Sequence, residues 1–266
     1  MQLLIGLLLG VLIGYLAYRG HALTRNGFLA AALVGGLVFG FGGLAWGGLM
    51  LLFFFSSSGL SRAFAVRKAR LNEKFAKGSR RDEAQVLANG GLAALLALAH
   101  VLLAKPEWTW IAFAGAMAAV NADTWATELG VLSPHLPRLI TNGKSVERGT
   151  SGAVSLVGYL AALGGASFIA LGALLLQRSS PSMVLLPAIT LAGLAGSTLD
   201  SWLGATLQAI YFCPTCQKET ERHPRHLCGA PTSLRRGLSW LNNDRVNFAC
   251  SLMGALSALL FWQWFI

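Results

Sequence analysis

Long apolar runs alternate with short polar stretches along the whole chain. Several of these runs reach the roughly 20 residues that a helix needs to cross a bilayer. The pattern therefore predicts an all-α fold: a polytopic membrane helix bundle of about eight spans that forms a single integral membrane domain over residues 1–266. The predicted spans are residues 3–18, 28–41, 43–60, 84–104, 108–130, 151–177, 184–211 and 246–266.

The second and third spans depend on one glycine cluster. Residues 28–55 form an apolar run that is long for a single span, and Gly40, Gly42 and Gly43 lie in its middle. Glycine adopts the backbone conformations that a tight turn requires. We therefore expect two shorter helices that meet at this cluster.

The composition narrows the class of protein. Hydrophobic residues make up 55% of the chain and charged residues 12%, about half of the ~25% charge of an ordinary soluble domain. This argues against a water-soluble enzyme and against a disordered chain. Four cysteines in 266 residues also do not make a disulfide scaffold.

Basic residues gather between the predicted spans. The formal net charge is +10, and 19 of the 21 lysines and arginines lie in segments that eight spans place on one side of the membrane. The positive-inside rule makes these large basic loops cytoplasmic and puts both termini outside. Attraction to membrane lipids then accounts for the charge, so we expect no nucleic-acid partner. The basic segments are residues 19–26, 61–83, 131–150 and 212–245, and only Lys105 and Arg178 fall on the other side.

The segment 61–83 is the most basic of these loops, with eight cations. It is expected to form an amphipathic helix or hairpin at the level of the lipid headgroups, with most of its cations solvated or bound to lipid. The localisation that follows is a multi-pass membrane protein, in the plasma membrane if the source is bacterial or archaeal.

Three acids occur inside predicted spans. Asp123 and Glu128 lie toward the cytoplasmic end of the fifth span and Asp200 lies in the seventh. An ionisable side chain costs at least ~2.5 kcal/mol at the centre of a bilayer, which marks each acid as a functional candidate. Carboxylates on adjacent helices suit Mg²⁺ that also binds substrate phosphates. Alternatively, they bind Na⁺ or protons in a transporter, or accept hydrogen bonds that hold the bundle together.

A glycine-rich loop follows the fifth span and leads into the sixth. Lys144 and Arg148 precede the sequence Gly149-Thr150-Ser151-Gly152, and Ser145 follows the lysine. Two cations beside bare backbone N–H groups at a helix N-terminus form a good phosphate site. A P-loop is rejected, because the required first glycine is absent and no strand precedes the loop. The alternative is an ordinary capped helix start with cations that face lipid.

Other polar side chains accompany these motifs. They are candidates for contacts with substrate or nucleotide because they lie next to the acids or at the mouth of a span, where they could instead cap a helix. These residues are Asn89, Asn121, Thr124, Thr127, Ser201, Asp244 and Asn247.

The segment 212–245 contains a possible zinc site. Cys213 and Cys216 form a Cys-x-x-Cys pair, and His226 and Cys228 follow at a spacing close to that of a zinc ribbon. Thiolates with imidazole suit Zn²⁺ in a reducing cytoplasm. His223 competes with His226 as the fourth ligand, and free thiols are the alternative to a metal.

Taken together, these motifs resemble the integral membrane family that contains transmembrane protein 19 and plant phytyl-phosphate kinase. The resemblance runs from about residue 20 to the C-terminus. It is carried by residues 85–90 (Gln-Val-Leu-Ala-Asn-Gly), 123–130 (Asp-Thr-Trp-Ala-Thr-Glu-Leu-Gly), 144–152, 200–206 (Asp-Ser-Trp-Leu-Gly-Ala-Thr) and 243–247 (Asn-Asp-Arg-Val-Asn).

The resemblance implies a kinase that uses a nucleoside triphosphate, CTP rather than ATP, to phosphorylate an isoprenyl monophosphate such as phytyl, geranylgeranyl or farnesyl phosphate. Asp123, Glu128 and Asp200 would hold Mg²⁺, and Lys144 and Arg148 would bind phosphates. The alternatives are an ion-coupled transporter or lipid translocator, and a lipid-binding scaffold. The oligomeric state is not predicted.

Overall fold

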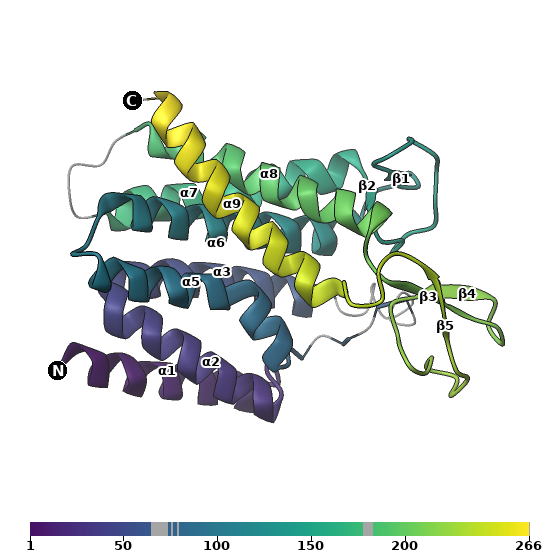
Figure 1. Cartoon of the computed structure of the whole chain (residues 1–266), viewed down its shortest axis with the longest axis horizontal. Helices are drawn as coiled ribbons and strands as arrows, with labels where there is room; N and C mark the ends of the chain where they lie inside the picture. The colour runs from purple at the N-terminus through teal and green to yellow at the C-terminus, as the bar shows by residue number, and fades with distance from the viewer. Residues whose placement is uncertain (65–73, 76, 79, 178–182, 266) are drawn as a thin grey trace.

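The computed structural model describes residues 1–64, 74–75, 77–78, 80–177 and 183–265. Within these ranges, eight α-helices of 13 to 24 residues run back and forth through one bundle, which confirms the all-α class (Figure 1). They are α1 (Gln2–Arg19), α2 (Arg25–Leu37), α3 (Gly43–Ala63), α5 (Glu83–Leu102), α6 (Glu107–Gly130), α7 (Leu156–Leu176), α8 (Leu185–Thr206) and α9 (Asn243–Phe265).

In the part of the chain that the structure describes, five helical segments are long and apolar enough to cross a membrane. They are α1, the 39-residue segment Arg25–Ala63, α5, α7 and Asn243–Trp264 in α9. Helices α6 and α8 are not among them, since they carry the acids and several other polar residues. The eight membrane spans therefore stay a prediction, whereas the eight helices of the described residues are observed in the structure.

The segment Arg25–Ala63 is a pair of antiparallel helices. The π-helix η1 (Val38–Gly42) and Gly43, with φ +78°, join α2 to α3. Gly40 packs against Gly6 near the start of α1. Arg62, at the end of α3, donates a hydrogen bond to the carbonyl of Gly20, just after the end of α1. The chain therefore reverses direction at the glycine cluster, as predicted.

Small residues allow α1 and α2 to pack closely. A Cβ atom at Gly10 would lie 2.5 Å from the carbonyl oxygen of Ala32 and 2.5 Å from the nitrogen of Gly36. Glycine on both faces lets two helix backbones approach in this way, and van der Waals contact then stabilises the pair inside a membrane. Larger side chains at these positions would separate the two helices.

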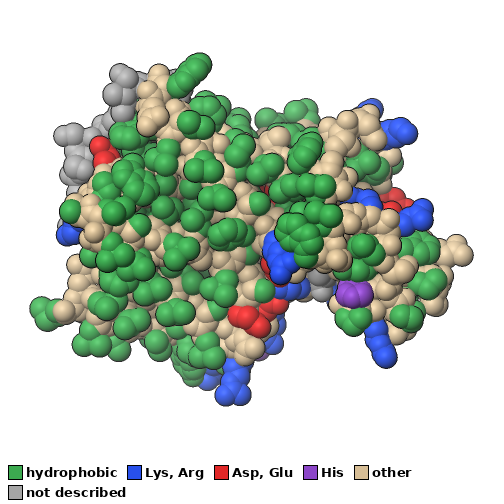
Figure 2. Space-filling model, viewed as in Figure 1, with side chains coloured by type: hydrophobic (Ala, Val, Ile, Leu, Met, Phe, Trp, Pro, Cys, Tyr) green, Lys and Arg blue, Asp and Glu red, His purple; other side chains and the backbone are tan. Residues whose placement is uncertain are grey.

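The outer surface of the bundle is apolar. Leucines on successive turns of α1 and α7 are exposed, among them Leu8 at 62% and Leu160 at 59%. Figure 2 shows hydrophobic side chains over the face of the bundle, and basic side chains mainly near the end that carries β3, β4 and β5. Such a surface is suited to lipid rather than water.

The inter-helix segments that hold most of the basic residues lie at one end of the bundle, which we call the polar end. Two small sheets occur there: β1 (Arg138–Leu139) pairs with β2 (Ala153–Val154), and β3 (Ile210–Cys213) lies between β4 (Lys218–Thr220) and β5 (Ser233–Arg236). Lys105 lies at the opposite end, after α5. Arg178 is outside the described residues, as is much of the segment 61–83 in which an amphipathic helix or hairpin was expected.

Two predicted span boundaries are corrected. The span predicted over 184–211 is shorter, because α8 ends at Thr206 and the chain continues into β3. The span predicted over 151–177 begins at Leu156, because β2 precedes it and the Ser155 hydroxyl accepts a hydrogen bond from the N–H of Gly158. The second correction places the glycine-rich loop outside the helix that follows it.

Candidate functional site

A polar pocket of about 290 Å³ lies at the polar end, between α5, α6, α7, α8 and the start of α9. It brings together most of the residues that the sequence singled out. The predicted residues that line it are Asn89, Asp123, Thr124, Thr127, Glu128, Arg148, Gly149, Thr150, Ser151, Gly152, Asp200, Ser201 and Asn247.

Asp123 and Asp200 form the acidic part of this pocket. They come from adjacent helices, α6 and α8, and Asp200 interacts electrostatically with Asp123 and with Glu221, which also lines the pocket. The Oδ2 atom of Asp200 is buried and has no hydrogen-bond partner among the described residues. Like charges that converge on a buried site with an unsatisfied oxygen fit a divalent cation.

Glu128 lies one turn further along α6, in a different environment. It is only 5% exposed, and its Oε1 atom accepts a 2.7 Å hydrogen bond from the hydroxyl of Ser61 on α3. Its charge also acts on the guanidinium of Arg81. Burial lowers the pKa of Arg81 to about 10, and Glu128 opposes this shift, so Arg81 is a cation at neutral pH.

The glycine-rich loop forms another part of the pocket wall. Gly149 and Gly152 have φ values of +79° and +80°, a region in which residues with a side chain are strained. The hydroxyl of Ser151 donates to Oε1 of Gln208 at 3.0 Å, which ties the loop to the chain after α8. The loop leads through Ser155 to the N-terminus of α7, where backbone N–H groups and the helix dipole favour an anion.

Arg148 lies in the same wall. One guanidinium nitrogen donates to the carbonyls of Ser133 and Pro134, at 2.8 and 3.2 Å. Its Nε is buried and has no hydrogen-bond partner in the part of the chain that the structure describes. The nearby Lys74 donates to Glu147 and to the Arg148 carbonyl. Arg148 is thus held in place and keeps a donor for an anion.

Lys144 and Ser145 do not line the pocket. They are exposed and lie in the hairpin of β1, next to the turn at Gly143. The backbone of this hairpin is fixed, since the carbonyl of Lys144 accepts from Leu139 N–H and Arg138 bridges to Ser145. Lys144 is thus exposed on the hairpin, whereas Arg148 follows the hairpin and lines the pocket.

Asn121 and Asp244 also lie outside the pocket. Asn121 is fully buried in α6, where its side chain accepts from Ser56 and donates to the carbonyl of Gly165, and so joins α3, α6 and α7. Asp244 accepts a 2.6 Å hydrogen bond from Lys77, which also pairs with Asp82. Both side chains thus bond to neighbouring segments and do not line this pocket.

The pocket also contains residues that were not predicted for it. Arg81 and Gln85, at the start of α5, line it together with Glu221 from the chain after β4. The sequence grouped Arg81 with the solvated cations of 61–83. A local signal was present for Gln85, which forms the capping box of α5 with Asp82.

The cysteine and histidine cluster is assembled as predicted. The ligand atoms of Cys213, Cys216, His226 and Cys228 all lie within 4.8 Å of one another. His226 Nδ1 is 3.4 Å from the sulfurs of Cys216 and Cys228, and the sulfurs of Cys213 and Cys228 are 3.6 Å apart. Tetrahedral zinc with Zn–S bonds of about 2.3 Å would put its sulfurs roughly 3.8 Å apart, so the cluster fits this metal.

His223, the competing ligand, lies elsewhere. Its ring stacks on Tyr211, with centroids 4.3 Å apart. The structure therefore favours His226 over His223 as the fourth residue of the cluster.

The fold and the site define a class: a multi-helix integral membrane protein with an acid-lined polar pocket at its basic end. The model of the integral membrane protein DUF92 family matches residues 8–255, and the chain belongs to this family. No solved structure matches the chain.

Named relatives cover nearly the whole chain. Protein PGR of Arabidopsis thaliana is 33% identical over 95% of this chain and 93% of its own length. An uncharacterized membrane protein of Methanocaldococcus jannaschii is 27% identical over 97% and 94%. Protein VTE6, chloroplastic, of Arabidopsis thaliana is 28% identical over 92% of this chain and 66% of its own length.

Proposed function

We propose that the protein is a nucleotide-dependent kinase that phosphorylates an isoprenyl monophosphate to the diphosphate. The observation that carries the proposal is the convergence of Asp123 and Asp200 with the glycine-rich loop in one pocket at the end of an apolar bundle. The motif resemblance to the family of phytyl-phosphate kinase supports the same chemistry. Family membership alone does not establish a substrate.

The pocket residues divide into two groups by charge. Asp123 and Asp200, with Glu128 beside them, would hold Mg²⁺, which neutralises phosphate charge when it is bound. Arg148 and the backbone N–H groups of residues 149–152 would bind the phosphates of the nucleotide. Phosphoryl transfer depends mainly on positioning and charge stabilisation, and these are the two functions that the residues can supply. Lys144 and Ser145 have no part in this assignment.

The proposed reaction needs no separate base. An anionic oxygen of the prenyl monophosphate attacks the γ-phosphorus of the nucleoside triphosphate. A new P–O bond forms, the bond between the γ-phosphorus and the bridging oxygen breaks, and the nucleoside diphosphate leaves with that oxygen. CTP is the donor expected from the resemblance, and ATP is the alternative. The positive-inside rule places this pocket at the cytoplasmic face.

The test is direct phosphorylation by purified protein in detergent or nanodiscs. Farnesyl, geranylgeranyl and phytyl phosphates are incubated with Mg²⁺ and either CTP or ATP, and the diphosphate is quantified. Asp123→Asn and Asp200→Asn should each lower turnover at least 100-fold. Glu107→Gln, which removes an acid at the opposite end of the bundle, is the matched control and should retain turnover. Unchanged turnover in both aspartate variants would refute the site assignment.

A transporter remains the competing function, since acids on two helices also suit ion coupling. Ion or lipid flux in proteoliposomes without nucleotide consumption, combined with no diphosphate from any acceptor, would favour it. Flux that Asp123→Asn abolishes would place that activity in the same pocket.

We also propose that Cys213, Cys216, His226 and Cys228 bind a structural zinc ion. The position of this site supports a structural role. Strand β4 continues into Glu221, whose Oε1 accepts a 2.8 Å hydrogen bond from Gln208. Gln208 in turn accepts a hydrogen bond from Ser151 of the glycine-rich loop. The metal would thus stabilise a small sheet that braces the phosphate-binding wall of the pocket.

A further inference from the structure

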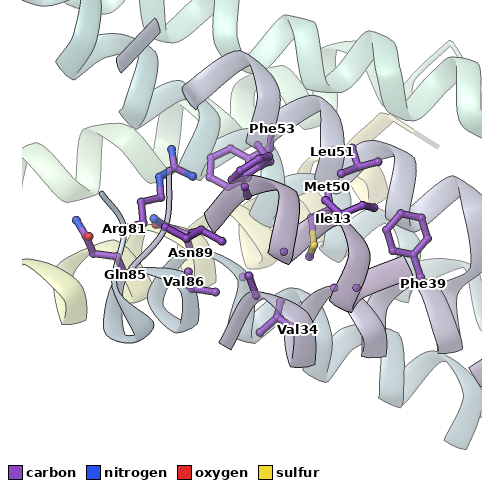
Figure 3. Close-up of a pocket in the computed structure, with 18 of the residues that line it drawn as sticks. Ile13, Val34, Phe39, Met50, Leu51, Phe53, Arg81, Gln85, Val86 and Asn89 are labelled. Atoms are coloured by element: carbon purple, nitrogen blue, oxygen red, sulfur yellow. The ribbon is translucent and has the colours of Figure 1, made fainter. Parts of the chain in front are cut away.

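A second cavity lies beside the polar pocket, between α1, α2, α3 and α5 (Figure 3). Its volume is about 90 Å³, and its wall is almost entirely apolar, with Ile13, Val34, Phe39 and Met50 among the lining residues. Glycines on α1 and α2 complete the wall. Protein interiors are normally close-packed, so a space of this kind calls for an occupant.

The two cavities meet at three polar side chains. Arg81, Gln85 and Asn89 line both of them. They recur at intervals of four residues, so they follow one face of α5 and of the chain that leads into it. In Figure 3 they lie at one end of the apolar cavity, and Phe39 lies at the other. A ligand whose polar head bound here would extend an apolar tail into the bundle.

Arg81 is the residue at this junction that calls for an anion. Its guanidinium lies 5.2 and 6.0 Å from the ring centroids of Phe53 and Phe54. It donates no hydrogen bond to any residue within the described ranges. Glu128 attracts the charge, but a guanidinium carries five N–H donors in a planar fork that matches a phosphate.

The backbone of Arg81 is fixed in place. Its N–H donates to the carbonyl of Ala22 and its carbonyl accepts from Thr24, both at 2.9 Å. The guanidinium therefore extends from a rigid attachment to the loop between α1 and α2, and binding a phosphate would require little ordering of the chain.

From this arrangement, and resting on the kinase proposed above, we infer that the apolar cavity holds the part of the acceptor's isoprenoid chain next to the phosphate and that Arg81 binds the monophosphate, with Gln85 and Asn89 as further polar contacts. A volume of about 90 Å³ corresponds to roughly one isoprene unit. The ligand class follows from the wall: one anionic head joined directly to an apolar chain. A nucleotide is polar along its length and belongs at the glycine-rich loop. Acceptor and donor would then meet in the pocket that Asp123 and Asp200 line.

Photolabelling tests this inference without turnover. The probe is farnesyl monophosphate with a diazirine on the isoprene unit next to the phosphate, added to the full-length protein in nanodiscs without nucleotide. Labelled peptides should come from α1, α2 or α3, around Ile13, Val34 and Met50. Labels confined to α7 and α8 would overturn the inference.

Cavity-filling variants on two walls sharpen this test. Ile13→Trp on α1 and Met50→Trp on α3 should each lower labelling at least fivefold. Their matched controls on the same helices are Leu12→Trp and Leu44→Trp, at positions 54% and 67% exposed, and these should label like the parent protein. Labelling that is unchanged in both cavity variants would also contradict the inference. Thermal melting identifies any variant that fails to fold.

A separate labelling experiment tests the role of Arg81. Arg81→Gln should lower labelling by the phosphate probe at least tenfold and leave labelling by the corresponding alcohol unchanged, while Arg81→Lys should restore part of the signal. An equal loss with both probes would show that Arg81 only supports the structure.

The outcomes separate this inference from the proposed function. Labelling in the cavity without any diphosphate product would leave the lipid site standing and refute the kinase. Diphosphate formation with labels elsewhere would support the kinase and overturn the tail site.

Discussion

Gly152 gives the sharpest test of the glycine-rich loop, because its backbone conformation and its surroundings both exclude a side chain. Its φ is +80°, and a Cβ atom there would lie 2.5 Å from the Cα of Ala205 on α8. Van der Waals contact requires about 3.5 Å. In Gly152→Ala, the loop must therefore move away from α8 by roughly 1 Å.

Gly152→Ala lowers the free energy of unfolding in two ways. A left-handed backbone conformation costs an alanine roughly 1–2 kcal/mol relative to glycine, and overpacking costs about 1–3 kcal/mol more. Gly143 in the preceding hairpin is the matched control, because it has φ +68° and a Cβ atom there would meet nothing within 4 Å. Gly143→Ala therefore carries only the first cost, while Gly152→Ala carries both.

Activity should separate the two variants further. A displacement of about 1 Å in groups that position a substrate can lower the rate on the order of 100-fold. We expect this loss for Gly152→Ala in the diphosphate assay, and near-normal turnover for Gly143→Ala. Melting temperatures in detergent measure the stability difference. Equal melting temperatures and equal rates for the two variants would refute the close packing of the loop on α8 as the source of its geometry.

Three further predictions concern the remaining contacts. Purified protein should contain about one zinc ion per chain by elemental analysis; Cys216→Ser should lose it and lower the melting temperature, and Cys250→Ser, in α9, should keep it. Lys77→Met should destabilise the protein by about 1–2 kcal/mol, since it leaves the partly buried Asp82 and Asp244 without their shared cation. Although burial acts to lower the pKa of Lys77, the hydrogen bonds and charges of Asp244 and Asp82 outweigh it and raise the pKa above 10.5. The stabilisation by the Lys77 ion pairs is therefore fully present at neutral pH and is lost as the pH rises through the raised pKa of Lys77. The difference in melting temperature between the parent protein and Lys77→Met should shrink above pH 10.5. A constant difference would contradict this assignment. Asn121→Ala should cost about 1–3 kcal/mol through the unpaired Ser56 and Gly165 groups but leave the KM for nucleotide unchanged, because Asn121 does not line the pocket; a raised KM would contradict its purely structural role.

The helices and the acidic part of the site could be predicted because their signals are local. An apolar run shows its own length, and a carboxylate within it is conspicuous at a single position, as Asp200 shows. The glycine-rich loop could also be recognised from the sequence, since Gly149 and Gly152 lie in a short segment with serine and threonine. Each of these signals requires no knowledge of what the chain packs against.

The parts that could not be predicted depend on contacts between distant segments. Arg81 is one of eight cations in 61–83, and only its pairing with the chain at Ala22 and Thr24 brings it to the junction of the two cavities. Lys144 and Arg148 are four residues apart and look equivalent in the sequence. Lys144 lies in the hairpin closed by the pairing of Arg138 with Ser145, whereas Arg148 follows that hairpin and donates to the carbonyls of Ser133 and Pro134.

Helices α6 and α8 explain how acids are accommodated in an apolar bundle. Both are long enough to cross a membrane but are less apolar than the five candidate spans, and α6 is the most enclosed helix of the described chain, with every residue from Thr109 to Ala122 buried. Its neighbours α5, α7, α8 and α9 surround it, so lipid contact falls to the more apolar helices. A helix shielded in this way needs no apolar surface of its own, and its polar end can hold Asp123 and Glu128 without exposing them to lipid. The low hydropathy of α6 is therefore a consequence of its central position, and in this fold the least apolar helices are the ones that carry the site.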